Sequence, residues 1–269
     1  MPATQFQPMS IGQILDQAFR IFRQNFVQFV TIVAVVEVPL ILLQVLALMR
    51  VQPAVAEDGT VHPEAIATRM VVVLISVLLL LIGRGLINAV LLKSVSESYL
   101  GNEVSVGQAY GFVWPKLGRI IWASIAYGVV VGVGLLLLVV PGVLFMLWYS
   151  LLVPVIVMES MATGAAFKRS KTLVRGNLGK VFLLTFLLAV IGAIAGGLCG
   201  GIAAIVAPKS QLTSGLANLI AQILVAPLSS AAMVLLYYDM RIRKEGFDLE
   251  MLAKQFGSGE APADAHTPA

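Results

Sequence analysis

Apolar residues fill six long stretches of the chain, and charged residues fall almost entirely between them. About 20 apolar residues in a helix, each rising about 1.5 Å, are needed to cross roughly 30 Å of hydrocarbon. The six stretches are Phe26–Met49, Met70–Leu92, Ile120–Val139, Val143–Met158, Val181–Ala207 and Leu216–Tyr238. The pattern predicts an all-α integral membrane protein with six transmembrane helices.

Local sequence features mark two of the connections between these spans and one of the spans themselves. Only Val140-Pro141-Gly142 separates the third span from the fourth, which predicts a tight turn and a helical hairpin. The fourth span is the shortest and contains Pro154. The loop Arg50–Arg69 contains acidic residues and prolines, so we expect an irregular excursion rather than a domain.

A similar polar and apolar segment precedes the first, third and fifth spans. The segments are Ser10-Ile11-Gly12-Gln13, Ser105-Val106-Gly107-Gln108 and Ala162-Thr163-Gly164-Ala165-Ala166-Phe167-Lys168. Each has a hydroxyl residue suited to cap a helix, then apolar residues at helical spacing. The segments reach breaks at Asn25, Pro115 and Gly176-Asn177. We therefore predict three cytoplasmic interfacial amphipathic helices.

One such helix and the two spans after it form a unit that occurs three times, roughly at 10–100, 105–160 and 162–245. Two spans per unit give every copy the same orientation, so we predict a parallel repeat about a pseudo-threefold axis. The alternative is that the similarity is chance, because multi-pass proteins commonly carry such segments. The units form a single membrane domain, 10–255, between an N-terminal tail, 1–9, and a disordered tail, 256–269.

Positive charge is distributed unequally between the two sides of the predicted membrane domain. One side has fourteen Lys and Arg residues: Arg20, Arg23, Lys93, Lys116, Arg119, Lys168, Arg169, Lys171, Arg175, Lys180, Arg241, Arg243, Lys244 and Lys254. The other side has Arg50, Arg69 and Lys209. Cytoplasmic loops carry the excess of Lys and Arg, so we predict that both termini lie in the cytoplasm.

Composition agrees with lipid as the solvent. The chain is 59% apolar and 12% charged, against about 25% charged in soluble domains, and its mean hydropathy is +0.93. Residues 1–19 contain no Lys or Arg, so the first apolar run is expected to remain as an anchor. Nucleic acid is not an expected partner, because the cations lie against the bilayer.

Catalytic and metal-binding signals are lacking in the sequence. Cys199 is the single cysteine, and His62 and His266 are far apart, which argues against a disulfide framework or metal cluster. The sequence has no Gly-x-Ser-x-Gly, His-Glu-x-x-His, Walker or Cys-x-x-Cys motif. We expect no cofactor and no enzymatic activity.

The segment Ala166-Phe167-Lys168-Arg169-Ser170-Lys171-Thr172-Leu173-Val174-Arg175-Gly176-Asn177 resembles the Ala-x-x-Arg-Ser-x-x-Leu-x-x-Gly-Asn segment of a bacterial six-span family. That family is related to the membrane domain of glycerophosphoryl diester phosphodiesterase. The Val140-Pro141-Gly142 turn, the Pro154 and Glu159 pair and the ending from Tyr237 to Glu250 are similar too. The resemblance covers roughly residues 8–255. It implies the fold and a bacterial inner-membrane location, but no reaction, because the phosphodiesterase chemistry belongs to a separate soluble domain in fused relatives.

Glu37 and Arg84 are the charges deepest in predicted spans. Counted from the cytoplasmic side, at 1.5 Å per residue, they lie about 16 and 14 Å deep, and each costs about 2.5–3.5 kcal/mol there. Two interpretations stand. The residues form a structural pair that fixes the register of the first hairpin, or they mark a polar site or ion path.

Small residues spaced four apart let helices approach closely. They are Gly128 and Gly132 on the third span, and Gly192, Gly196, Gly197, Gly200 and Gly201 on the fifth. Close packing within the chain and self-association between chains are the two uses considered.

The segment from Gly164 to Arg175 carries four cations beside apolar residues: Lys168, Arg169, Lys171 and Arg175. Such a helix can contact anionic lipid headgroups. The alternative is ordinary cytoplasmic positive charge. Glu159 and Asp239 end spans nearby and are expected to pair with cations.

Three hypotheses for function follow. The first is a non-enzymatic membrane module that associates with lipids or with another protein. The second is a small transporter or lipid translocator with a polar path near Glu37 and Arg84. The third is an accessory membrane domain for a separately encoded lipid-degrading enzyme.

Overall fold

The computed structural model describes residues 8–50, 63–102, 105–207 and 211–246, and all regular structure within these ranges is helical. The helices in chain order are α1 (Ile11–Gln24), α2 (Phe26–Arg50), α3 (Pro63–Leu100), α4 (Val106–Val113), the short 3₁₀ helix η1 (Trp114–Lys116), α5 (Leu117–Leu137), α6 (Val139–Trp148), α7 (Leu152–Glu159), α8 (Thr163–Val174), α9 (Leu178–Val206) and α10 (Gln211–Glu245).

The all-α membrane character predicted from the sequence is confirmed. Five stretches of the described helices are long and apolar enough to cross a membrane: Phe26–Leu43, Val106–Leu137, Val139–Glu159, Leu178–Val206 and Thr213–Glu245. A shorter apolar stretch, Ile66–Ser76, lies in α3. Large side chains such as Leu136 and Ile205 are 89% and 84% exposed. Such an apolar surface suits lipid rather than water.

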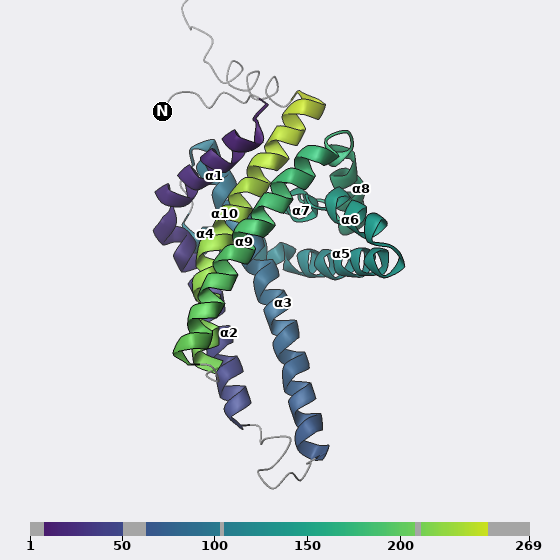
Figure 1. The fold of residues 1–269 in the computed structure, drawn as a ribbon. Helices are drawn as coiled ribbons and strands as arrows, with labels where there is room; N and C mark the ends of the chain where they lie inside the picture. Colours follow the sequence, from purple (N-terminus) through teal and green to yellow (C-terminus); the bar gives the residue numbers. More distant parts are fainter. Residues whose placement is uncertain (1–7, 51–62, 103–104, 208–210, 247–269) are drawn as a thin grey trace, which may run out of the picture.

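Figure 1 shows how these helices are arranged. The two longest of the later helices, α9 and α10, run side by side, and α10 also contacts α1, α2, α3, α7 and α8. The lower ends of α2 and α3 extend beyond the α9–α10 pair. The hairpin of α5 and α6 runs crosswise to α3. The hydrophobic core lies where the α9–α10 pair, the helices α2 and α3, and the α5–α6 hairpin meet, around the C-terminal half of α10.

Helices form at all three segments predicted to be interfacial, and two of the three predicted caps are confirmed. Ser10 caps α1 and Ser105 caps α4, each in a capping box with the Gln three residues later. The third cap was predicted wrongly, because Ala162 occupies the cap position of α8 and Thr163 is its first helical residue. The hydroxyl of Thr163 instead donates a hydrogen bond to the Arg119 carbonyl, at 3.4 Å.

The three predicted helix breaks are confirmed. Asn25 ends α1, and its side-chain amide donates to the carbonyl of Ile21 at 3.1 Å. Pro115 lies in η1, between α4 and α5. Gly176 has a φ of +89°, a left-handed conformation that costs glycine little, and it separates α8 from α9.

The predicted turn at Val140-Pro141-Gly142 is wrong by two residues. The chain turns at Leu138, which is extended (φ −161°, ψ 142°), and Pro141 and Gly142 lie in the first turns of α6. Proline is tolerated there because its missing N–H has no partner at a helix start. The turn is tight because Gly134 and Gly142 meet: a Cβ on Gly134 would lie 2.9 Å from the Gly142 Cα.

The fourth predicted span is interrupted. The helix stops at Trp148 and resumes at Leu152, giving α6 and α7 in place of one helix. Pro154 explains the break, since its ring would clash with the carbonyl four residues earlier in a continuous helix. Part of the predicted outer loop is helical, because α3 begins at Pro63. Residues 51–62, most of the tail 1–9, and the tail 256–269 lie outside the described residues.

Candidate functional site

The two helices of the first hairpin, α2 and α3, approach each other closely at Gly83 of α3. Gly83 of α3 faces α2 there: a Cβ on Gly83 would lie 2.5 Å from Leu40 Cδ1 and 3.2 Å from Val36 Cγ1. The absence of a side chain at Gly83 lets the side chains of Leu40 and Val36 pack directly against the backbone of α3.

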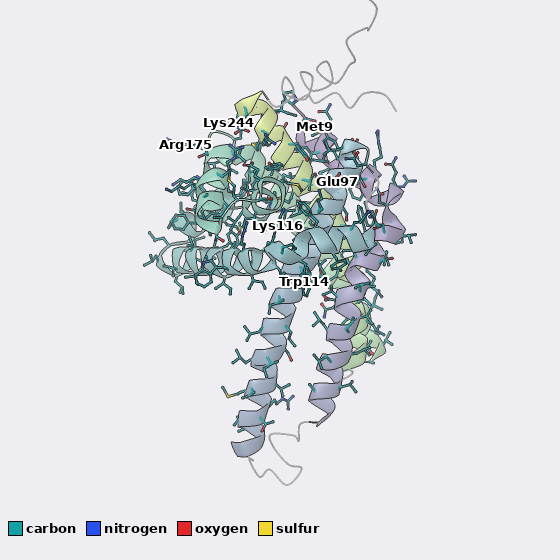
Figure 2. The ribbon with its side chains drawn as sticks, turned by 180° about the vertical axis from the view of Figure 1, so that it is seen from behind. Met9, Glu97, Trp114, Lys116, Arg175 and Lys244 are labelled. Carbon is teal, nitrogen blue, oxygen red and sulfur yellow. The ribbon has the colours of Figure 1, made fainter. Side chains whose placement is uncertain are left out.

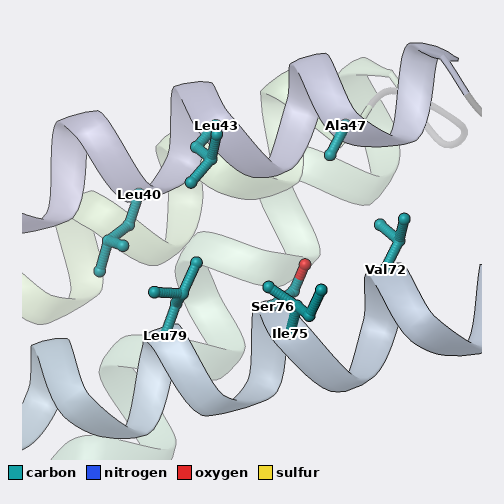
Figure 3. Close-up of a pocket in the computed structure, with 7 residues that line it drawn as sticks. All are labelled: Leu40, Leu43, Ala47, Val72, Ile75, Ser76 and Leu79. Carbon is teal, nitrogen blue, oxygen red and sulfur yellow. The ribbon is translucent and has the colours of Figure 1, made fainter.

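Below this contact, toward the C-terminal end of α2 and the N-terminal end of α3, the two helices leave an apolar groove between them (Figure 3). Its volume is about 170 Å³. The lining residues are Leu40, Leu43 and Ala47 from α2, and Val72, Ile75, Ser76 and Leu79 from α3. Only the Ser76 hydroxyl is polar among these side chains. An apolar lining of this kind suits an apolar molecule better than water.

Glu37 lies one helical turn from the top of this groove, three residues before Leu40. Its side chain is buried, with 2% of the residue exposed, and its Oε2 atom has no hydrogen-bond partner. On the neighbouring turn, α10 packs against α2, since a Cβ on Gly215 would lie 2.8 Å from Ile41 Cγ2. An ionised carboxylate without a partner is expensive in such surroundings. Glu37 is therefore suited to a neutral acid or to a ligand that supplies the missing partner.

The structure brings Arg84 near Glu37 without joining the two. Arg84 is exposed and follows Gly83, which contacts α2. Neither an ion pair nor a hydrogen bond connects the two side chains within the described residues. Residues next to each other on a helix point about 100° apart. Because Gly83 faces α2, Arg84 points to the side of the hairpin and makes no direct contact with Glu37. A role of the two charges in fixing the register of the hairpin stays a prediction.

A second polar region lies at the cytoplasmic end predicted for α10, where three consecutive residues each reach a different element. Tyr237 donates a hydrogen bond to Glu159 of α7 at 2.8 Å. The hydroxyl groups of Tyr238 and Ser96 of α3 are 2.7 Å apart. All three residues of α10, Tyr237 to Asp239, are almost fully buried.

Asp239 holds the N-terminal segment and α9 to α10. It accepts a hydrogen bond from the Met9 backbone N–H at 2.7 Å and pairs with Lys180 of α9 at 2.5 Å and with Arg243 at 2.9 Å. The Lys180 ammonium also donates to the Met9 carbonyl. The predicted pairing of Asp239 with nearby cations is confirmed, and its geometry indicates a structural fastening.

The four cations of the basic helix α8 have different surroundings. Arg169 turns inward, where it bonds Glu159 at 2.9 Å and forms an ion pair with Glu245. Lys171 lies 4.1 Å from the ring centre of Trp148. Lys168 and Arg175 are exposed. Arg169 is thus a structural residue, and the other three cations remain available at the surface.

The predicted packing glycines fall into two groups, those that face another helix and those that do not. A Cβ on Gly192 would lie 3.5 Å from Val225 Cγ1, so this glycine faces α10. The others have no atom of another helix within 4 Å of their Cβ positions: Gly128, Gly132, Gly196, Gly197, Gly200 and Gly201. The close contacts form instead at Gly83, Gly134, Gly142 and Gly215.

The sequence predicts the pairing of Asp239 with cations, but the hydrogen bonds of Tyr237 and Tyr238 were not predicted. Tyr237, Tyr238 and Asp239 end an apolar helix, and three consecutive residues on a helix point in directions about 100° apart. Three polar groups in three directions require three neighbours at the same level. The groove residues carried no such signal, because their types are those of any span.

The chain matches no protein family model, no curated protein and no solved structure. The resemblance to the membrane domain of glycerophosphoryl diester phosphodiesterase stays a prediction. Within the described residues, no group of three or more His, Cys, Asp or Glu side chains is placed to hold a metal ion.

Proposed function

We propose that the protein is a non-enzymatic, multi-pass lipid-binding module of the bacterial inner membrane, and that the groove between α2 and α3 holds a lipid acyl chain. The observation that carries the proposal is the groove itself, with its seven lining residues and single hydroxyl. The helices that form it extend beyond α9 and α10 (Figure 1), so lipid reaches their flanks. An acyl chain is the apolar molecule present at this depth in a bilayer.

A membrane orientation with both termini in the cytoplasm is part of this proposal. The unequal distribution of Lys and Arg supports it. The proposal also includes the threefold repeat, which the element order supports: one shorter helix and then two membrane segments occur as α1–α2–α3, as α4–α5 with α6 and α7, and as α8–α9–α10.

The test fills the groove and measures bound lipid. The protein is extracted into native lipid discs, washed into detergent and analysed for retained phospholipid by mass spectrometry. Ala47→Phe places a ring in the groove. The matched control, Leu74→Phe, adds a ring on α3 at a residue that is 61% exposed and does not line the groove. We expect Ala47→Phe to lose retained lipid and Leu74→Phe to keep it. Equal retention by both variants and the unmodified protein would contradict the groove.

A transporter or lipid translocator is the second candidate, and the unpartnered Oε2 of Glu37 favours it. A polar path would bring water to this residue. With Cys199→Ala as the background, Glu37→Cys reacts with a membrane-impermeant maleimide only if such a path exists. Reaction from one side of the membrane supports transport, and protection from both sides supports a closed lipid-binding module.

A further inference from the structure

A third feature of the molecule lies where α3, α4, η1 and α5 meet, with Phe112 on α4. Two lysine ammonium groups approach the same phenyl ring: Lys93 Nζ lies 4.1 Å and Lys116 Nζ 3.6 Å from the ring centre of Phe112. The two like charges are therefore closer to each other than the Debye length of about 8 Å at physiological salt. A cation over a ring face is stabilised, but a second cation beside it repels the first.

A guanidinium adds to this positive charge. Arg119 follows Lys116 by three residues, which are neighbours on a helix surface. Both residues reach the end of α7, since Lys116 donates to the Val157 carbonyl at 3.1 Å and Arg119 to the Ser160 carbonyl at 3.2 Å. Each bond uses one of the several N–H donors of these groups, so donors remain for a ligand.

One carboxylate of this junction is already engaged. Glu97 forms an ion pair with Lys93 and accepts a hydrogen bond from Asn102 at 2.8 Å. Burial opposes ionisation of Glu97, but the hydrogen bonds from Lys93 and Asn102 outweigh it and lower the pKa of Glu97 below its ordinary value. Glu97 is therefore charged at neutral pH and compensates Lys93. It leaves the charges of Lys116 and Arg119 in excess.

The cluster has an exposed aromatic border. Trp114 is 67% exposed and Phe112 is 37% exposed. Figure 2 shows Trp114 and Lys116 close together near the start of α5, above the lower half of α3 in this view. Exposed tryptophan is typical of the headgroup level of a membrane. Phosphate that binds here would belong to a lipid rather than to bulk solution.

We propose that Lys93 and Lys116, which face the ring of Phe112, together with the neighbouring Arg119 bind the phosphate of an anionic phospholipid headgroup. Capping of the α7 carbonyls explains one hydrogen bond of Lys116 and one of Arg119, but not why Lys93 and Lys116 converge on one ring with a single engaged carboxylate beside them. An added phosphate reduces that repulsion. The site is separate from the α2–α3 groove and does not depend on it.

The test is a lipid titration of the delipidated protein followed by native mass spectrometry. The probes are phosphatidylglycerol, phosphatidylcholine and soluble glycerol phosphate. Each membrane-proximal cation contributes about fivefold to the binding of an anionic lipid. We expect preferential binding of phosphatidylglycerol, an about fivefold loss of its affinity in Arg119→Gln, and a larger loss in the double variant Lys116→Gln with Arg119→Gln. Lys116→Arg keeps the charge and is expected to keep the affinity.

The charge-matched control is Arg20→Gln with Arg23→Gln on α1, where both residues are exposed. An equal loss of phosphatidylglycerol affinity in this control would mean that the lipid is attracted to any basic surface of the protein. That result would overturn the proposal. Binding of glycerol phosphate as strong as that of phosphatidylglycerol would overturn the lipid source. If the double variant fails to fold, the phosphatidylglycerol affinities of Arg119→Gln and Lys116→Arg are compared instead. Equal affinities of these two variants would contradict the site. The groove proposal is tested separately with Ala47→Phe, so one proposal can fail while the other holds.

Discussion

Asp239→Asn should unfasten the N-terminal segment and α9 from α10. Asp239 is fully buried, while the side chains of its partners Lys180 and Arg243 are 14% and 34% exposed. The asparagine can still accept the Met9 N–H, but its amide group presents donors to two cations. Removing one partner of a buried ion pair costs about 3–5 kcal/mol. Because Lys180 and Arg243 both reach solvent in part, we expect the lower end, about 3 kcal/mol.

The assay is the thermal unfolding of detergent-purified protein, followed by size-exclusion chromatography. For a chain of this size, a loss of about 3 kcal/mol lowers the Tm by roughly 6–12 °C. The matched control is Asp16→Asn on the exposed face of α1, which makes the same chemical change. A surface substitution of this kind changes stability by less than about 0.5 kcal/mol. Equal Tm values for the two variants would refute the structural role of Asp239.

Three further predictions concern packing and polar groups. Gly142→Ala should disrupt the α5–α6 hairpin and lower the Tm, because its Cβ would lie 2.6 Å from a backbone nitrogen of α5, whereas Gly128→Ala, with open space around it, should leave the Tm unchanged. Tyr238→Phe removes its hydrogen bond to Ser96 and should lower stability by about 1–2 kcal/mol in the same assay, with no change in expression. Glu37→Gln should not lower folded yield, measured by fluorescence-detected size-exclusion chromatography, because the carboxylate has an unpartnered oxygen and no ion pair to lose; a large loss would show that Glu37 has a charged partner after all.

Local chemistry made much of the fold predictable. The capping boxes at Ser10 and Ser105 and the break at Gly176 depend on residues within one helical turn, so the sequence contains the information needed to place them. The apolar runs are equally local. Their length fixes helices that suit a membrane, because an unpaired backbone group in hydrocarbon is costly.

Tertiary contacts decided what could not be predicted. Pro141 is compatible with a turn and with the first turn of a helix, and the close approach of Gly134 to Gly142, eight residues later, selects the second. Counting residues gave the depths of Glu37 and Arg84 but not the directions in which they point. That direction follows from Gly83, which turns its own face toward α2 and leaves Arg84 at the side of the hairpin. The crosswise course of α5 likewise has no signal in its apolar sequence (Figure 1).

The most direct measurement is cysteine accessibility in intact cells. In a Cys199→Ala background, Thr60→Cys places one thiol between α2 and α3 in the sequence, and Ser258→Cys places one after α10. A membrane-impermeant maleimide should label position 60 in intact cells and position 258 only after the membrane is opened. Labelling of both positions in intact cells, or protein that stays dispersed without detergent, would contradict a multi-pass protein with its termini in the cytoplasm.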